Sequence, residues 1–196
     1  MLFAEPIGVT LLVSAALERL GVDYLVGGSL ASSLHGIPRA TLDVDIVADL
    51  RMPHVKPLVV ALENEFFIDV DMVTDAVRRR STFNVLHLAT MFKVDIFVVG
   101  DDDLLAVELS RKQRVRVVDS PPADLNLATA EDMVLQKLIW YREGGSTSDR
   151  QWGDVLGILR TQGERLDRQY LDRWATRKGL DELLARALAD AEIPST

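Results

Sequence analysis

Apolar residues along the first 120 positions recur in two patterns, one typical of helices and one typical of strands. A spacing of three to four residues predicts amphipathic helices, and short runs rich in Val, Ile and Phe predict strands. We expect helices at 9–20, 29–35, 53–65, 71–80 and 102–112, and strands at 24–26, 42–48, 83–88, 92–99 and 114–118. These segments predict the α/β (α+β) class, with a small mixed sheet flanked by helices.

The pattern changes at 120–122, beyond which we predict no further strand. Further helices are expected at 129–141, 149–161, 167–178 and 180–191. Thr129 and Asp132 mark the start of the first of them, because their spacing fits a capping box. We therefore expect an α/β core over residues 1–120, followed by a C-terminal helical portion over 121–196 that packs on it.

A glycine turn precedes the second predicted strand. Gly27 and Gly28 end the strand at 24–26 and lead into a helix that starts at Ser29. Backbone N–H groups at a helix N-terminus favour an anion such as a triphosphate, and glycine lets the backbone approach that anion closely. The same turn also joins ordinary strands to helices, so it indicates a phosphate site only in combination with other features.

Asp43 and Asp45 supply such a feature, because they lie in a segment that is otherwise apolar. Side chains along a strand alternate between its two faces, so both carboxylates point the same way. Two like charges at this spacing repel one another unless one keeps a proton or a cation lies between them. Paired carboxylate oxygens suit Mg²⁺ or Mn²⁺.

A third carboxylate, Asp95, lies in another apolar strand and shares its face with Lys93. If this strand neighbours the one at 42–48, three carboxylates converge with a lysine beside them. Three carboxylates can hold two divalent ions, the arrangement used for in-line phosphoryl transfer. Lys93 then either meets a phosphate oxygen or neutralises an aspartate.

Lys137 lies in a predicted helix that is apolar on nearly every side. A lysine in such surroundings needs an acidic partner or an outlet to water. Asp154 is the candidate partner, although Arg150 lies four residues before it on the same predicted helix and could pair with it instead. A structural ion pair and a direct contact with phosphate are both open for Lys137.

Composition narrows the class of protein further. The chain has 196 residues, 48% of them hydrophobic, which suffices for a packed core. It has no cysteine, which excludes disulfides and thiolate metal sites. The apolar run at 7–17 is too short to span a membrane, so we expect a cytoplasmic protein without a membrane partner. A formal net charge of −8 argues against indiscriminate binding to nucleic acid.

The order Gly-Gly-Ser, Asp-x-Asp within a strand and a later strand Asp resembles the nucleotidyltransferase superfamily that includes DNA polymerase beta. The longer string GGSLASSLHGIPRATLDVDI is similar to bacterial nucleotidyltransferases related to the toxins of type IV toxin–antitoxin and abortive-infection systems. This resemblance implies a sheet of the nucleotidyltransferase type. It also implies that Asp43, Asp45 and Asp95 are the catalytic and metal-binding residues. The positions implied to bind nucleotide are Gly28, Ser29, Arg39, Thr41, Lys137 and Asp154, to which the strand pattern adds Lys93.

The expected activity is the metal-dependent transfer of a nucleoside monophosphate from an NTP to an acceptor hydroxyl, with Mg²⁺ or Mn²⁺ as cofactor. The resemblance points to RNA, such as tRNA, or to a protein as acceptor, and to a cognate antitoxin as a further partner. One alternative is an aminoglycoside-type transferase acting on a small molecule. Another is a non-catalytic module that binds a nucleotide or a partner. A monomer is the favoured state.

Overall fold

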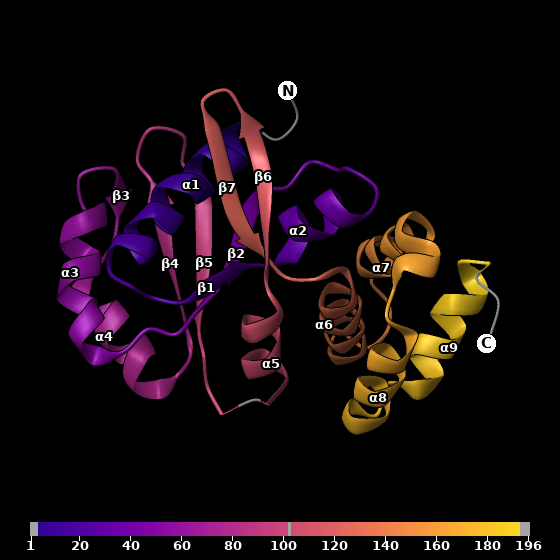
Figure 1. The fold of residues 1–196 in the computed structure, drawn as a ribbon. Helices are drawn as coiled ribbons and strands as arrows, with labels where there is room; N and C mark the ends of the chain where they lie inside the picture. The colour runs from indigo at the N-terminus through magenta and orange to yellow at the C-terminus, as the bar shows by residue number, and fades with distance from the viewer. Residues whose placement is uncertain (1–3, 102, 193–196) are drawn as a thin grey trace. The chain divides into compact units, whose positions relative to one another are not determined.

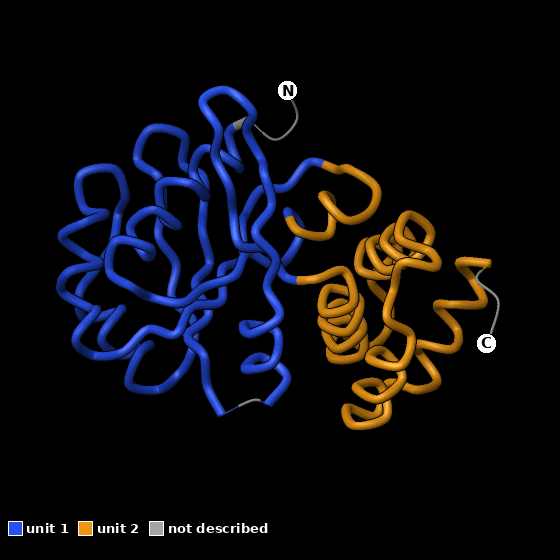
Figure 2. Tube along the Cα trace, viewed as in Figure 1, with its two compact units in different colours: residues 1–30, 40–128 blue, residues 31–39, 129–196 orange. Residues whose placement is uncertain are grey.

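The computed structural model describes residues 4–101 and 103–192, and the chain divides into two compact units. Unit 1 comprises residues 1–30 and 40–128, and unit 2 comprises residues 31–39 and 129–196 (Figure 2). The short segment 31–39 therefore groups with the C-terminal residues, although unit 1 precedes and follows it in sequence.

Unit 1 is built on a mixed sheet. Its strands are β1 (Tyr24–Val26), β2 (Asp43–Ala48), β3 (Phe66–Phe67), β4 (Thr82–His87), β5 (Lys93–Val98), β6 (Gln113–Asp119) and β7 (Pro122–Leu127). Over the described residues they form one seven-stranded sheet in the order β3-β4-β5-β2-β1-β7-β6 (Figure 1). The pairs β2–β5 and β1–β7 are parallel, and all other neighbours in this order are antiparallel. The expected α/β class with a mixed sheet is confirmed.

Helices cover one face of this sheet. Unit 1 contains α1 (Ala4–Arg19), α3 (Met52–Leu62), α4 (Val70–Arg79) and α5 (Asp103–Arg111), and α2 (Gly28–His35) begins in unit 1 and continues in unit 2. The even-numbered residues of β2 and β5 are buried in one hydrophobic core with residues of α1, α3 and α4. Because side chains alternate along a strand, the odd-numbered residues of β2 and β5 face the other way.

Two strands and one helix start differ from the sequence-based expectations. The pattern predicted neither β3 nor β7, although Leu125 and Leu127 of β7 are fully buried. Pro122 concealed β7, yet proline is compatible with the first residue of a strand. Helix α1 begins at Ala4 rather than at residue 9, because Pro6 falls in its first turn, where no intrahelical N–H bond is lost.

Unit 2 is helical over its described residues. It contains α6 (Ala130–Glu143), α7 (Asp149–Gln162), the 3₁₀ turn η1 (Gly163–Arg165), α8 (Arg168–Lys178) and α9 (Asp181–Asp190). The side chains of Thr129, Ser148 and Asp167 accept a backbone N–H at the starts of α6, α7 and α8, which satisfies donors that a helix leaves open. Across the described ranges, no helix combines the length and apolar character that crossing a membrane requires.

The segment 31–39 packs closely against the backbone of α7 at Gly36. A Cβ added at Gly36 would lie 2.8 Å from the backbone nitrogen of Ile158 and 2.9 Å from the carbonyl carbon of Gly157. Next to this contact, the Gln162 side-chain amide donates to the carbonyl oxygen of His35 at 2.6 Å. Only a residue without a side chain allows the two backbones to approach this closely.

Replacing Gly36 with alanine should therefore destabilise the protein by about 1–3 kcal/mol, because backbone atoms would have to shift. Gly153→Ala is the matched control, since nothing lies within 4 Å of a Cβ at that helical position. The control should leave stability unchanged or raise it by up to about 1 kcal/mol. Urea denaturation of both variants measures the difference, and equal stabilities would contradict the close backbone packing.

Candidate functional site

The register of β2 on β5 places the acidic residues of these strands side by side. Asp43 lies opposite Lys93, and Asp45 lies opposite Asp95. All four are half-buried residues on the face that the core does not use. Neighbouring strands are about 4.8 Å apart, so Asp45 and Asp95 form a pair of like charges across the two strands. The sequence analysis made convergence of the carboxylates conditional on these strands being neighbours, and β2 and β5 are adjacent.

Lys93 compensates part of this negative charge. Its Nζ lies 2.7 Å from Oδ2 of Asp95. The hydrogen bond to Asp95 is the largest influence on the pKa of Lys93 and raises it, with further electrostatic contributions from Asp43 and Asp45. The ammonium therefore stays charged and acts on all three carboxylates. Of the two roles expected for Lys93, this structure shows the neutralising contact.

The glycine turn lies against Asp45. The backbone N–H of Gly27 donates to the carbonyl oxygen of Asp45 at 2.9 Å. Gly28 has a φ of +57°, and a Cβ added there would lie only 1.6 Å from Oδ2 of Asp45. Ser29 follows in the first turn of α2 and is buried. The absence of a side chain at Gly28 thus leaves room for the Asp45 carboxylate beside the start of the helix.

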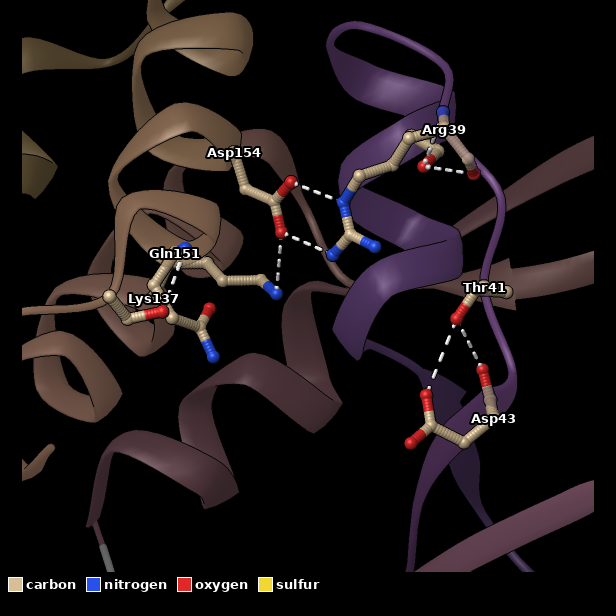
Figure 3. Close-up of polar contacts among 8 residues, drawn as sticks. Arg39, Thr41, Asp43, Lys137, Gln151 and Asp154 are labelled. Atoms are coloured by element: carbon tan, nitrogen blue, oxygen red, sulfur yellow. Dashed lines mark hydrogen bonds and ion pairs between the residues drawn. The ribbon is translucent and has the colours of Figure 1, made fainter.

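Thr41 holds the other aspartate of β2. Its hydroxyl donates to the carbonyl oxygen of Asp43 at 2.8 Å and lies 3.3 Å from Oδ1 of the same residue (Figure 3). This contact fixes the entry of the chain into β2. In this structure, Thr41 therefore positions Asp43.

The chemistry of these side chains suits a divalent cation, because carboxylates supply hard oxygen ligands. Within the ranges 4–101 and 103–192, however, no three His, Cys, Asp or Glu side chains are grouped so that they could hold a metal ion. Asp43 and Asp45 lie two positions apart on one face of β2, and both are half-buried. Oδ2 of Asp95 already carries the Lys93 ammonium.

Sequence reasoning missed Asn84, which lies beside Asp95 on the other flank of β5. The antiparallel register of β4 on β5 pairs Asn84 with Asp95. Asn84 is exposed, between the buried residues Phe83 and Val85. The alternation of buried and exposed residues in β4 can be read from the sequence. The register of β4 on β5, which brings the Asn84 amide next to the Asp95 carboxylate, cannot be read from it.

A second polar cluster lies within unit 2 and links three elements (Figure 3). Arg39 binds Asp154 of α7 in a bidentate manner, with Nε 2.7 Å from Oδ1 and Nη2 2.8 Å from Oδ2. Lys137 of α6 places its Nζ 2.9 Å from Oδ2 of the same carboxylate. The side chains of Lys137 and Asp154 are 2% and 7% exposed, and that of Arg39 is 26% exposed.

The predicted pair of Lys137 with Asp154 is therefore present, and Arg39 joins it where the sequence had suggested Arg150. Burial alone would raise the pKa of Asp154, but the hydrogen bonds from Arg39 and Lys137 outweigh burial and lower it. Two cations on one buried carboxylate satisfy the requirement that buried charges be paired. No local sequence signal could reveal the contact with Arg39, which lies 115 residues away in the chain.

Comparison with known proteins finds similarity to solved structures but none at the level of sequence. No family model matches the sequence, and no curated protein matches it. The solution structure of the antibiotic-resistance factor ANT(2'')-Ia is similar with a TM-score of 0.54 and 14% identity, covering 92% of this chain and 98% of that chain. The crystal structure of ANT(2'')-Ia in complex with adenylyl-2''-tobramycin gives a TM-score of 0.55 and 12% identity, covering 89% and 99%.

An antigenic nucleotidyltransferase-like protein from Paracoccidioides brasiliensis is also similar, with a TM-score of 0.53 and 17% identity over 95% of this chain and 93% of that chain. At such low sequence identity, structural similarity shows only that the fold is shared. The chain thus has the mixed α/β fold of the nucleotidyltransferases to which it is similar. The narrower resemblance to toxins stays a prediction.

Replacing Gly28 with alanine should disturb the carboxylate site. The new Cβ collides with Asp45, whereas Gly21→Ala serves as a control with a similar φ of +67° and nothing within 4 Å. Both variants carry the cost of a positive φ, about 1 kcal/mol, and only Gly28→Ala adds the displacement of a carboxylate. We expect Gly28→Ala to lose at least about 1 kcal/mol more than Gly21→Ala in urea denaturation.

The excess cost should shrink when Asp45 is also replaced by alanine, which removes the two closest atoms, Oδ2 and Cγ, and leaves Cβ at 2.8 Å. A double-mutant cycle on the free energy of unfolding measures this coupling. Additive effects of the two substitutions would contradict the contact.

Replacing Lys137 with methionine separates the two roles left open for this residue. Because its side chain is 2% exposed and pairs with Asp154, its loss should lower the free energy of unfolding by about 1–3 kcal/mol. Affinity for an NTP should change little if the pair is structural. Lys56→Met, at an exposed position of α3, is the control. A stable Lys137→Met protein with clearly weakened NTP binding would instead assign the ammonium to phosphate.

Proposed function

We propose that this protein is a divalent-cation-dependent nucleotidyltransferase, which moves a nucleoside monophosphate from an NTP to an acceptor hydroxyl. The register of β2 on β5 carries the proposal, because it sets Asp43, Asp45 and Asp95 on one face of the sheet. The turn at Gly28, in contact with Asp45, adds a helix N-terminus suited to phosphate. The fold shared with nucleotidyltransferases of known structure supports the same activity.

Each residue has a separate task in this proposal. Asp43 and Asp45 hold Mg²⁺ or Mn²⁺, and Asp95 orients the acceptor hydroxyl. A bound cation would neutralise phosphate charge and lower the pKa of that hydroxyl. The backbone at Gly28 and Ser29 receives the phosphates. The acceptor hydroxyl loses its proton to solvent and its oxygen forms a bond to the α-phosphorus. The bond from that phosphorus to the bridging oxygen breaks, and pyrophosphate leaves.

Apart from Thr41, which contacts Asp43, the remaining predicted nucleotide-binding residues fall into two groups. Lys93 is 43% exposed and flexible, so it can turn to a phosphate oxygen once it leaves Asp95. For Arg39, Lys137 and Asp154 we propose a mainly structural role, because they satisfy one another within unit 2. Arg39 retains exposed surface and is the member of this cluster best able to contact a nucleotide.

The acceptor that the sequence resemblance favours is RNA, such as tRNA, or a protein. In that case the chain would act as the toxin of a toxin–antitoxin pair, with the antitoxin as its partner. Growth arrest on expression in a bacterium, abolished by Asp45→Asn, is the expected sign of this role.

A small cationic acceptor is the second candidate. It is supported by the likeness to ANT(2'')-Ia, whose crystal structure contains adenylyl-2''-tobramycin, and by the net charge of −8. The basic residues near β6 are also largely neutralised, since Lys112 pairs with Asp23, and Arg114 and Arg116 both pair with Asp124. They therefore offer little of the positive surface that a nucleic acid backbone requires.

Asp45→Asn should lower nucleotidyl transfer by at least about a hundredfold, because it removes one charge of the metal-binding pair and keeps its size. Pyrophosphate release is measured with each NTP and Mg²⁺, in the presence of bacterial RNA, bacterial protein or an aminoglycoside. Label in RNA, in protein or in the small molecule identifies the acceptor class.

Asp49→Asn is the matched control, because Asp49 lies just beyond the opposite end of β2 and pairs with Arg51. It should keep the wild-type rate. A wild-type rate in Asp45→Asn would contradict the proposed activity, as would the failure of every NTP and acceptor to yield pyrophosphate.

A further inference from the structure

The four polar side chains on the open face of β2 and β5 form two rows. Asp43 and Lys93 make up the first row, and Asp45 and Asp95 make up the second. Lys93 does not bind the aspartate directly opposite it. Its ammonium instead lies 2.7 Å from Oδ2 of Asp95, two positions along its own strand.

The contact with Lys93 occupies Oδ2 of Asp95, the carboxylate that orients the acceptor hydroxyl in the proposed function. A carboxylate oxygen that accepts a hydrogen bond from an ammonium at this distance is already compensated by a positive charge. A divalent cation or an acceptor hydroxyl approaching Asp95 meets that positive charge first. The lysine and the cation therefore compete for the same negative potential, which Asp43 and Asp45 increase.

Lys93 is also able to move away. Its side chain is 43% exposed, whereas that of Asp95 is 16% exposed. A lysine has four flexible methylene groups, and its head group can return to water when another cation takes its place beside Asp95. The carboxylate stays in place, and the cation that accompanies it is exchangeable.

From this geometry we infer that Lys93 is an exchangeable counter-ion, which occupies Asp95 until a divalent cation displaces it and so weakens metal binding in the absence of nucleotide. This inference rests on the proposed function, because it assumes that the carboxylates bind a metal. It assigns to Lys93 a regulatory role in metal loading that precedes any contact with phosphate.

An ordinary ion pair on the surface is the competing explanation, and the chain offers a matched control for it. Lys112 and Asp23 form an ion pair of the same 2.7 Å length, also in unit 1. The side chain of Lys112 is 21% exposed and that of Asp23 is 55% exposed. A substitution of Lys112 thus removes a comparable ion pair without touching β2 or β5.

The experiment measures Mn²⁺ affinity in the absence of nucleotide, from the free Mn²⁺ signal in electron paramagnetic resonance. Lys93→Met should bind Mn²⁺ about tenfold more tightly than the wild type, because a competing charge has been removed at a partly screened site. Lys93→Arg keeps the charge and should stay near the wild-type affinity. Lys112→Met should match the wild type, and Asp45→Asn should lose most of its binding.

Thermal unfolding supplies a second readout. Without metal, Lys93→Met should melt below the wild type, because three carboxylates lose their counter-ion. Millimolar Mn²⁺ should then raise its melting temperature by more than it raises that of the wild type. If Lys93→Met is recovered unfolded, Lys93→Gln removes the same charge with a polar side chain and is measured in its place.

The outcomes separate the two proposals. Equal or weaker Mn²⁺ binding by Lys93→Met, in a protein whose wild type binds Mn²⁺ and whose Asp45→Asn variant does not, would overturn the role of Lys93 and leave the metal site standing. Tighter binding by Lys93→Arg as well as by Lys93→Met would also overturn it, since the charge would then be irrelevant. If neither the wild type nor Lys93→Met binds Mn²⁺, the metal site itself is overturned.

Discussion

The parallel pairing of β2 with β5 is the constraint on which the candidate site depends. Parallel strands need a long crossover, and here α3, β3, α4 and β4 lie between them in sequence. The register pairs Asp45 with Asp95, although these residues are 50 positions apart in the chain. Because side chains alternate along a strand, a shift by one residue would send the carboxylates into the hydrophobic core, so the core residues hold this register in place.

Both polar clusters balance charge locally, but to different degrees. In unit 2, two cations share the buried carboxylate of Asp154, and the protein interior leaves them little freedom to rearrange. In unit 1, the half-exposed Lys93 binds Asp95 and is also influenced electrostatically by Asp43 and Asp45. The first arrangement is typical of a structural support. The second is typical of a site that binds a further cation.

Most of the fold and part of the site followed from local patterns in the sequence. Alternation predicted β2 and β5 and the shared face of Asp43 and Asp45, since these features depend on neighbouring residues only. The strand β7 was missed because Pro122 is unfavourable in most strands, and its burial depends on pairing with β1 and β6. The contact of Arg39 with Asp154 and the placement of Asn84 beside Asp95 depend on tertiary structure and register, which no local pattern contains.

The grouping of residues 31–39 with the C-terminal helices has a consequence for dividing the chain. This segment is inserted between β1 and β2, yet Gly36 packs on the backbone of α7 and His35 accepts a hydrogen bond from Gln162. A fragment that ends at residue 128 would keep the insertion and lose the surface that it packs on, and a fragment that starts at residue 129 would lack it. The two units are thus interlaced along the sequence, and neither can be obtained whole by a single cut in the gene.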